Sequence, residues 1–285
     1  MKRRLRFFQT SKFMVGLMGG VLLLAAPLRA EHYEVFLLAG QSNMDGRGLK
    51  ADLVGDLVKW AKPQPNVLIT FRGGGLRRTL TVSHGFHPLE PGFSGAVGTR
   101  PKWVPTQTFG PEVSFGGTMA ESLGRHVALI KCAEGGTNLQ KDWDPNEPDK
   151  LYGQWIRFVQ QTLKEMKSHR DTYNLAGVVW HQGESDAGLP DGEYQKLLTA
   201  FIQRTRTDLK ESNLPFVIGE VFDNKGRDRV RAGQKAVSVT VPHTAFASAQ
   251  GLSTLDKGTH FDAASQIELG KRMAQAMLSL IKPNQ

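Results

Sequence analysis

Residues 35–44 read VFLLAGQSNM, an apolar run that ends in a short polar turn. Five consecutive apolar side chains, Val35–Ala39, predict a strand that is buried on both faces, as in a parallel sheet. The turn that follows this strand carries a serine, Ser42. Ligands bind beyond the carboxyl ends of the strands in open α/β sheets, so this turn is a candidate functional position.

Similar apolar runs recur along the chain. Further strands are expected at Val127–Ile130, Leu175–Trp180 and Phe216–Ile218, and weaker candidates at Val67–Phe71 and Thr244–Ala247. Helical apolar stripes run from Ile156 to Met166, from Leu198 to Leu209 and from Ile267 to Ile281. This alternation predicts one α/β domain with a central parallel sheet. Residues 72–110 are rich in glycine and proline and predict a long surface excursion.

The first 30 residues differ from the remainder of the 285-residue chain. They contain six basic residues and no acidic one, and an apolar run occupies residues 13–28. This pattern predicts a secretory signal peptide over 1–30, with Ala30 as its last residue, and a mature domain over 31–285. An uncleaved N-terminal anchor is the alternative, although the run is shorter than the ~20 residues that span a bilayer.

The signal segment holds most of the excess positive charge. Without its six basic residues, the 36 lysines and arginines fall to 30 against 27 acidic residues, and the net charge of +9 falls to +3. This balance argues against a nucleic-acid partner. A single cysteine, Cys132, excludes an internal disulfide framework. The expected protein is secreted, periplasmic or extracellular, without stable membrane association after cleavage; the oligomeric state stays open.

Polar turns follow several of the expected strands. Ser42, the Gly135–Gly136 turn and the pair Gln182 and Glu184 come after three strands, and His260 precedes the last helix. The carboxyl ends of parallel strands share one edge, so these groups are expected to meet. A serine nucleophile needs a base, usually histidine, which in turn needs a carboxylate. The oxyanion formed during acyl transfer needs fixed N–H donors. These parts together indicate acyl transfer.

Five motifs carry a family resemblance: GQSNM at 40–44, FGPEVSFG at 109–116, GGT at 135–137, WHQGESDA at 180–187 and THFDAAS at 259–265. They resemble SGNH-type carbohydrate acetylesterases, in the branch that contains carbohydrate esterase family 6 acetylxylan esterases and sialate O-acetylesterase-like domains. The motifs occur in order over roughly residues 34–275. The resemblance implies a three-layer α/β/α flavodoxin-like fold and removal of O-acetyl groups from sugars, with no metal or organic cofactor.

The resemblance also implies roles for individual residues. Ser42 is expected as the nucleophile and His260 as the base. The Ser42 backbone N–H, a glycine of the Gly135–Gly136 turn and the side chain of Gln182 are expected to form the oxyanion hole. Met44 stands where a G-x-S-x-G elbow would place its second glycine, so an ordinary α/β-hydrolase is not expected.

The acid that orients His260 stays open at this point. In much of the superfamily an aspartate stands three residues before the histidine, but here that position is Lys257, and Asp256 lies one residue earlier. Either the loop shifts so that Asp256 reaches the ring, or Glu184 of the HQGE motif takes the role, as in some relatives. The intact motif slightly favours Glu184.

Three further residues are expected to contact the sugar: Asn43, Trp103 and Trp143. Aromatic faces suit the apolar faces of sugar rings, although Trp103 would equally suit loop packing and Trp143 a structural staple. The expected substrate is acetylated xylan or a related plant or algal polysaccharide. The alternatives are a sialate O-acetylesterase and, from another class, a non-catalytic carbohydrate-binding protein with a disabled triad, which the lysine at position 257 suggests.

Overall fold

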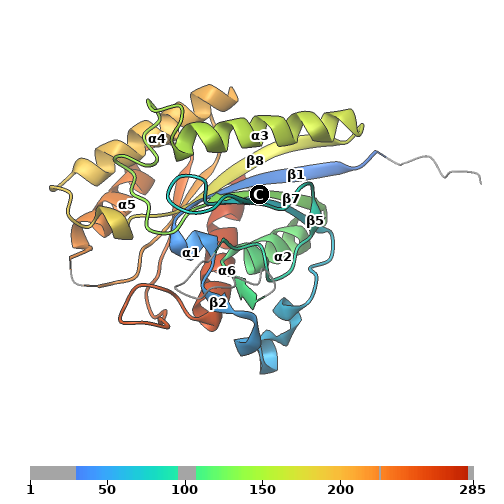
Figure 1. Cartoon of the computed structure of the whole chain (residues 1–285), viewed down its shortest axis with the longest axis horizontal. Coiled ribbons are helices and arrows are strands. Elements are labelled where there is room, and N and C mark those ends of the chain that lie inside the picture. Colours follow the sequence, from blue (N-terminus) through green and yellow to red (C-terminus); the bar gives the residue numbers. More distant parts are fainter. Residues whose placement is uncertain (1–29, 96–106, 225, 282–285) are drawn as a thin grey trace, which may run out of the picture.

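A computed structural model describes residues 30–95, 107–224 and 226–281 (Figure 1). The expected signal peptide therefore lies outside the described residues, apart from Ala30, and so does Trp103. Within the described part, no helix combines the length and apolar character needed to cross a membrane.

Six parallel strands form the centre of the molecule, and they include both weaker candidates from the sequence. Their order across the sheet is β10 (Thr244–Ala247), β9 (Phe216–Gly219), β8 (Thr172–His181), β1 (His32–Gly40), β7 (His126–Ala133) and β3 (Val67–Gly73). Without β3, the outermost of the parallel strands, this order is the flavodoxin-like 2-1-3-4-5. The predicted central parallel sheet is confirmed, with β3 as one additional strand beyond β7.

Helices cover both faces of the sheet (Figure 1). One face packs against α3 (Leu151–Ser168), α4 (Glu193–Leu209) and α5 (Asp228–Thr240), and the other against α2 (Glu112–Leu123) and α6 (Ala263–Ile281). Alternate residues of β1 enter the two cores: Leu37 joins the first and Phe36 the second, and both are fully buried. This arrangement confirms the three-layer α/β/α architecture.

The segment expected as a surface excursion carries short secondary structure in its described parts. Two antiparallel strands, β4 (Thr81–Val82) and β5 (His87–Pro88), pair with β3. A separate two-stranded sheet joins β2 (Gly48–Leu49) to β6 (Thr108–Phe109). Outside this segment, short 3-10 helices are η1 (Lys50–Asp52), η2 (Gly55–Ala61) and η4 (Glu184–Asp186). The excursion thus extends one edge of the sheet rather than forming a structureless loop.

The carboxyl ends of β7, β1 and β8 lie side by side, and the candidate motifs follow them directly. Gly40 ends β1 with φ of +153°, and a Cβ atom there would lie only 2.0 Å from the carbonyl oxygen of His181. A glycine therefore permits the close approach of the two strand ends. The N–H of Gln41 donates to that same carbonyl at 3.0 Å, which fixes the start of the serine turn.

Candidate active site

Ser42 opens the short helix α1 (Ser42–Asp45), directly after β1. Its Oγ lies 3.1 Å from Nε2 of His260, which comes from the loop before α6. This site falls at the point where the strand order reverses between β1 and β8, the position at which open α/β sheets bind ligands. The sequence placed both residues at this edge, and the structure brings them into contact.

The other ring nitrogen of His260 faces Asp256. Nδ1 lies 2.6 Å from Oδ2 of Asp256, whose Oδ1 accepts the backbone N–H groups of Thr259 and His260 at 2.8 and 2.9 Å. Burial raises the pKa of the Asp256 carboxyl, but these hydrogen bonds and the nearby ring outweigh it, so the net pKa lies below its ordinary value. The acid nearest the histidine is thus Asp256.

A glycine explains how an aspartate four residues before the histidine reaches the ring. Gly258 has φ of +90°, and its N–H donates to the carbonyl oxygen of Asp256 at 2.6 Å. This tight turn takes up the extra residue, Lys257, so that the carboxylate of Asp256 returns beside His260. The unusual spacing is therefore compatible with a Ser–His–Asp contact chain.

Glu184, the acid that the intact motif favoured, instead contacts Asn43. Its Oε1 accepts the Asn43 amide at 2.6 Å, and the same amide nitrogen donates to the carbonyl oxygen of Thr259 at 2.9 Å. The other amide atom, Oδ1 of Asn43, accepts the N–H of Phe261 at 3.0 Å. Asn43 is fully buried, so its expected contact with the sugar is corrected. It joins the serine turn to the residues on either side of His260.

Gln182 also differs from its expected place in the oxyanion hole. It is fully buried, and its amide nitrogen lies within hydrogen-bond distance of three acceptors: the side chains of Gln41 and Asp186 and the carbonyl of Thr137. An amide has two hydrogens to donate, so neither remains for a substrate oxygen. Gln182 therefore stabilises the segment after β7. It donates to Thr137 directly, and it also bonds Asp186, which accepts the N–H of Leu139.

The backbone groups expected in the oxyanion hole differ from Gln182 in their hydrogen bonding. Within the described part of the chain, the N–H groups of Ser42 and Gly136 have no hydrogen-bond acceptor. Gly136 is exposed, with φ of +78°. The neighbouring Gly135 packs against the serine: a Cβ atom on it would lie 3.4 Å from Cβ of Ser42. The expected donors and the serine hydroxyl thus share one small region.

A buried ion pair lies beneath the serine turn, and sequence reasoning missed it. Nζ of Lys131, on β7, lies 2.8 Å from Oε2 of Glu112, on α2, and both side chains are fully buried. Lys131 also donates to the carbonyl oxygens of Asp45 and Phe93, at 3.1 and 2.7 Å. The N–H of Gly110 donates to Oε1 of Glu112 at 3.0 Å. A lysine inside the apolar run of β7 was the available signal.

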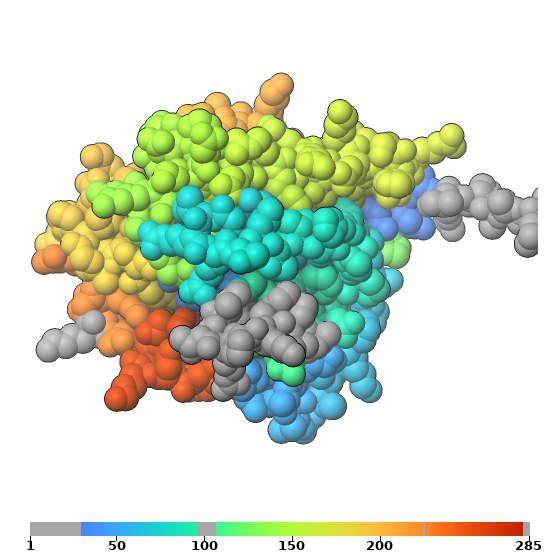
Figure 2. All heavy atoms as spheres, viewed as in Figure 1, coloured from blue at the N-terminus to red at the C-terminus, as the bar shows by residue number. Residues whose placement is uncertain are grey.

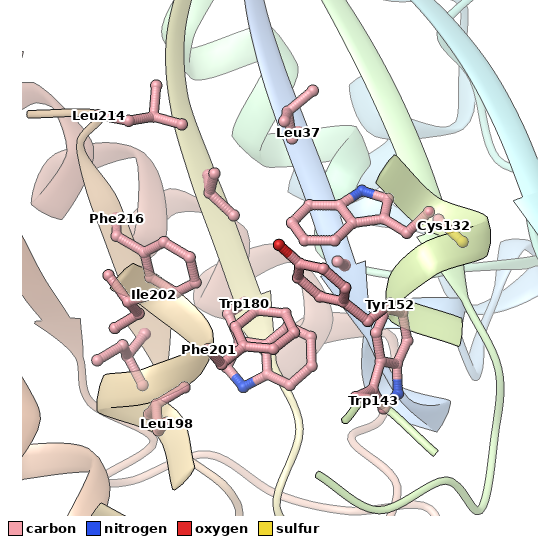
Figure 3. Close-up of a cluster of buried hydrophobic side chains, with 14 of the residues drawn as sticks. Leu37, Cys132, Trp143, Tyr152, Trp180, Leu198, Phe201, Ile202, Leu214 and Phe216 are labelled. Carbon is pink, nitrogen blue, oxygen red and sulfur yellow. The ribbon is translucent and has the colours of Figure 1, made fainter. Parts of the chain in front are cut away.

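Trp143 lies in the core instead of the expected sugar-binding cleft (Figure 3). Its indole is fully buried, edge-on to Trp180 at 5.1 Å between ring centroids. Its Nε1 donates to the hydroxyl of Thr137 at 3.0 Å. A side chain with no exposed surface has none to offer a sugar, so the structural staple is the role that the packing supports.

The fold and the site together define a class: a three-layer α/β/α protein with serine, histidine and aspartate in contact at the switch point of its sheet. Residues 32–279 match the family described as "Carbohydrate esterase, sialic acid-specific acetylesterase". The match covers most of the sequence, and the chain belongs to this family of carbohydrate esterases.

Individual proteins are also similar to this chain. A probable carbohydrate esterase of Arabidopsis thaliana is 29% identical over 255 residues, which cover 86% of this chain and 90% of the relative. A solved Arabidopsis thaliana structure superposes with a TM-score of 0.68 at 23% identity, over 89% of this chain and 100% of that one. A carbohydrate acetylesterase from Xanthomonas citri gives a TM-score of 0.62 at 18% identity, over 88% of this chain and 57% of its own. At these identities the solved structures show a shared fold.

Proposed function

We propose that this protein is a secreted serine esterase that removes O-acetyl groups from acetylated xylan or a related plant or algal polysaccharide. The observation that carries the proposal is the chain of contacts from Oγ of Ser42 through His260 to Asp256. Membership of a carbohydrate esterase family supplies the substrate class. The basic and apolar segments of residues 1–30 support export.

In the proposed mechanism, Oγ of Ser42 attacks the acetyl carbonyl carbon while Nε2 of His260 takes the hydroxyl proton. Asp256 holds the ring and stabilises its positive charge. The backbone N–H groups of Ser42 and Gly136 stabilise the oxyanion. The bond to the sugar oxygen then breaks, and that oxygen leaves with the proton from His260. Water attacks the acetyl-serine with the same base, which releases acetate and restores Ser42.

A sialate O-acetylesterase is the second candidate, and the description of the matched family favours it. Both candidates use the same serine chemistry and differ only in the sugar that carries the acetyl group. Acetylated xylan and an O-acetylated sialic acid, offered to the same preparation at equal acetyl concentration, separate them. A clear preference for the sialic acid in kcat/KM would replace xylan as the proposed substrate.

A carbohydrate-binding protein with a disabled triad is disfavoured by the same contacts. Lys257 suggested a broken triad, but Asp256 lies beside His260 despite the shifted spacing. All three side chains are therefore arranged for proton transfer from the serine. Binding of acetylated xylan without any release of acetate would reverse this preference.

The test of the proposed function is acetate release from acetylated xylan and from a small aryl acetate. We expect Ser42→Ala to lower kcat by at least about 10⁴-fold on both substrates, because the nucleophile is lost. Ser279→Ala, which removes an exposed serine hydroxyl on α6, is the matched control and should retain the parental rate. Equal rates for Ser42→Ala and the parent would rule out the serine mechanism.

A further inference from the structure

The proposed mechanism lacks a charged donor for the oxyanion. The amide of Gln182 is engaged inside the protein, which leaves the backbone N–H groups of Ser42 and Gly136. Hydrogen bonds from a charged donor are roughly twice as strong as those from a neutral one. Such a donor has most effect when it is fixed in place before the charge develops.

Arg47, two residues after α1, lies close to the turn of Gly135 and Gly136. A Cβ atom on Gly135 would lie 2.7 Å from Nη2 of Arg47 and 3.4 Å from Cβ of Ser42. The guanidinium and the side chain of Ser42 therefore both lie close to Gly135, in the turn that also carries Gly136. Nε2 of His260 contacts the serine through its Oγ, 3.1 Å away.

The guanidinium of Arg47 is held in this position by its other amino group. Nη1 donates to Oδ2 of Asp45 and to the carbonyl oxygen of Gly46, both at 2.7 Å. Asp45 is fixed in turn, because its Oδ1 accepts the N–H of Gly95 at 2.7 Å. The Arg47 side chain is only 16% exposed, so little water competes for it. Among the described residues, Nη2 has no hydrogen-bond acceptor.

We propose that Arg47 is a further catalytic residue, whose Nη2 donates to the acetyl carbonyl oxygen as that oxygen becomes negative. When Oγ of Ser42 bonds to the carbonyl carbon, the electron pair of the C=O π bond moves to oxygen, and Arg47 stabilises this charge without giving up a proton. The inference rests on the proposed function, since it concerns the same acyl transfer. Arg47 replaces Gln182 as the side-chain donor of the oxyanion hole.

The first test compares Arg47→Ala and Arg47→Lys with the parent on a small aryl acetate. Loss of one oxyanion donor typically lowers kcat by about 10²–10³-fold, which we expect for Arg47→Ala with little change in KM. Lysine keeps the charge and should recover part of the rate. Arg204→Ala is the matched control, because it also removes an arginine bonded to an aspartate, Asp208, but on the distant helix α4. It should retain the parental kcat.

A boronic acid separates oxyanion contact from a purely structural role. Phenylboronic acid forms a tetrahedral, negatively charged adduct with a serine hydroxyl and so resembles the transition state. If Arg47 touches the oxyanion, Arg47→Ala should weaken phenylboronic acid binding by about the factor by which kcat/KM falls. A kcat within about threefold of the parent, or a fall in kcat with unchanged boronate affinity, would overturn the proposal.

Gly135→Ala offers a second route if Arg47→Ala does not fold. The new methyl group would lie 2.7 Å from Nη2 of Arg47 and push that atom aside, whereas its distance of 3.4 Å from Cβ of Ser42 is an ordinary van der Waals contact. We expect Gly135→Ala to lower kcat and boronate affinity together, and to add little in the Arg47→Ala background because both changes act through one contact. Full additivity would count against Arg47.

The outcome for Ser42→Ala keeps this inference distinct from the proposed function. If Ser42→Ala retains turnover of the aryl acetate, the serine mechanism itself fails. If Ser42→Ala is inactive while Arg47→Ala and Gly135→Ala keep the parental kcat, the serine mechanism stands and only the role of Arg47 is rejected.

Discussion

The serine and the histidine of the candidate site are held in place by different kinds of contact. The serine turn rests on a buried ion pair, Lys131 and Glu112, whose side chains have no exposed surface. The histidine loop is part of the outer surface (orange-red around residues 250–262 in Figure 2), and the side chains of His260 and Asp256 are 31% and 43% exposed. The serine turn is fixed from the core, whereas the histidine loop is held by the turn at Gly258 and by hydrogen bonds from the side chains of Asn43 and Arg227.

This difference teaches where the sequence pattern is free to vary. The serine turn bonds to β8 through the backbone of His181 and to β7 through the buried Lys131, so a shift of one residue there would remove a partner from a buried charge. The histidine loop has its longer-range hydrogen bonds at Gly258, Thr259 and Phe261, and a short turn before them returns the carboxylate of Asp256 to the ring. The turn at Gly258 therefore accommodates the four-residue spacing between Asp256 and His260, whereas buried contacts restrict the serine turn.

The largest expected effect concerns the acid of the histidine loop. Asp256→Asn keeps an oxygen that can accept the N–H groups of Thr259 and His260, but it removes the charge that orients and stabilises the ring. Loss of the equivalent charge in a Ser-His-Asp triad lowers kcat by about 10⁴-fold, and we expect about 10²–10⁴-fold here, measured with an aryl acetate.

Glu184→Gln is the matched comparison, because it removes the other candidate acid and keeps an acceptor for Asn43. We expect less than about a tenfold loss in kcat for this variant. If Glu184→Gln lost more activity than Asp256→Asn, the orienting role would belong to Glu184, as the motif alone suggested.

The same comparison shows how far the sequence could predict this protein. Apolar runs identified the strands β1, β7 and β8, and their order along the chain placed Ser42 and His260 at one edge of the sheet. The burial of each side chain at that edge was not predictable from the sequence. A polar residue in a motif looks the same whether it faces a substrate, as expected of Gln182, or satisfies buried groups, as the structure has it.

Hydrogen bonds between residues far apart in the sequence were the second feature that the sequence could not predict. The residues next to Asn43 in the sequence do not indicate its hydrogen bonds to Glu184 and Thr259, since both partners lie more than 100 residues away. The choice between Asp256 and Glu184 depended on the backbone turn at Gly258. Trp143 was ambiguous for a simpler reason: an indole suits both an aromatic core and a sugar ring, and only its burial decides between them.

The next expected effect concerns stability under the serine turn. Lys131→Met removes one partner of the buried pair and leaves Glu112 as an uncompensated charge in the core. Breaking such a pair typically lowers the free energy of unfolding by about 3–5 kcal/mol, which denaturant titration at neutral pH would detect. We expect a loss in this range, because Lys131 also supports the carbonyl of Asp45.

Two further variants calibrate that measurement. Lys131→Met combined with Glu112→Leu removes both charges and should recover part of the lost stability. Arg204→Ala breaks an exposed pair with Asp208 and should cost no more than about 1 kcal/mol. A loss for Lys131→Met as small as that for Arg204→Ala would show that the serine turn does not depend on the buried pair.

The smallest expected effect is a pH-dependent contribution from Asp256. Its pKa is lower in the folded protein than the ordinary value of 3.8, so the ionised carboxyl stabilises the fold. This stabilisation is complete above the unfolded pKa and is lost as the pH falls through the lower folded pKa. Solvent screens a carboxyl that is 43% exposed, so the contribution should be small.

Denaturant titration of the parent and of Asp256→Ala from pH 6 downward measures this contribution. We expect the parent to be more stable at pH 6, and the difference to shrink below about pH 4, where the carboxyl begins to gain its proton in the unfolded chain. Asp56→Ala, at an exposed carboxyl of η2, controls for general effects of acid. The difference in the free energy of unfolding between the parent and Asp256→Ala could instead stay constant down to pH 2. That outcome would mean that the charge of Asp256 does not stabilise the loop. The charge would then act only in orienting His260.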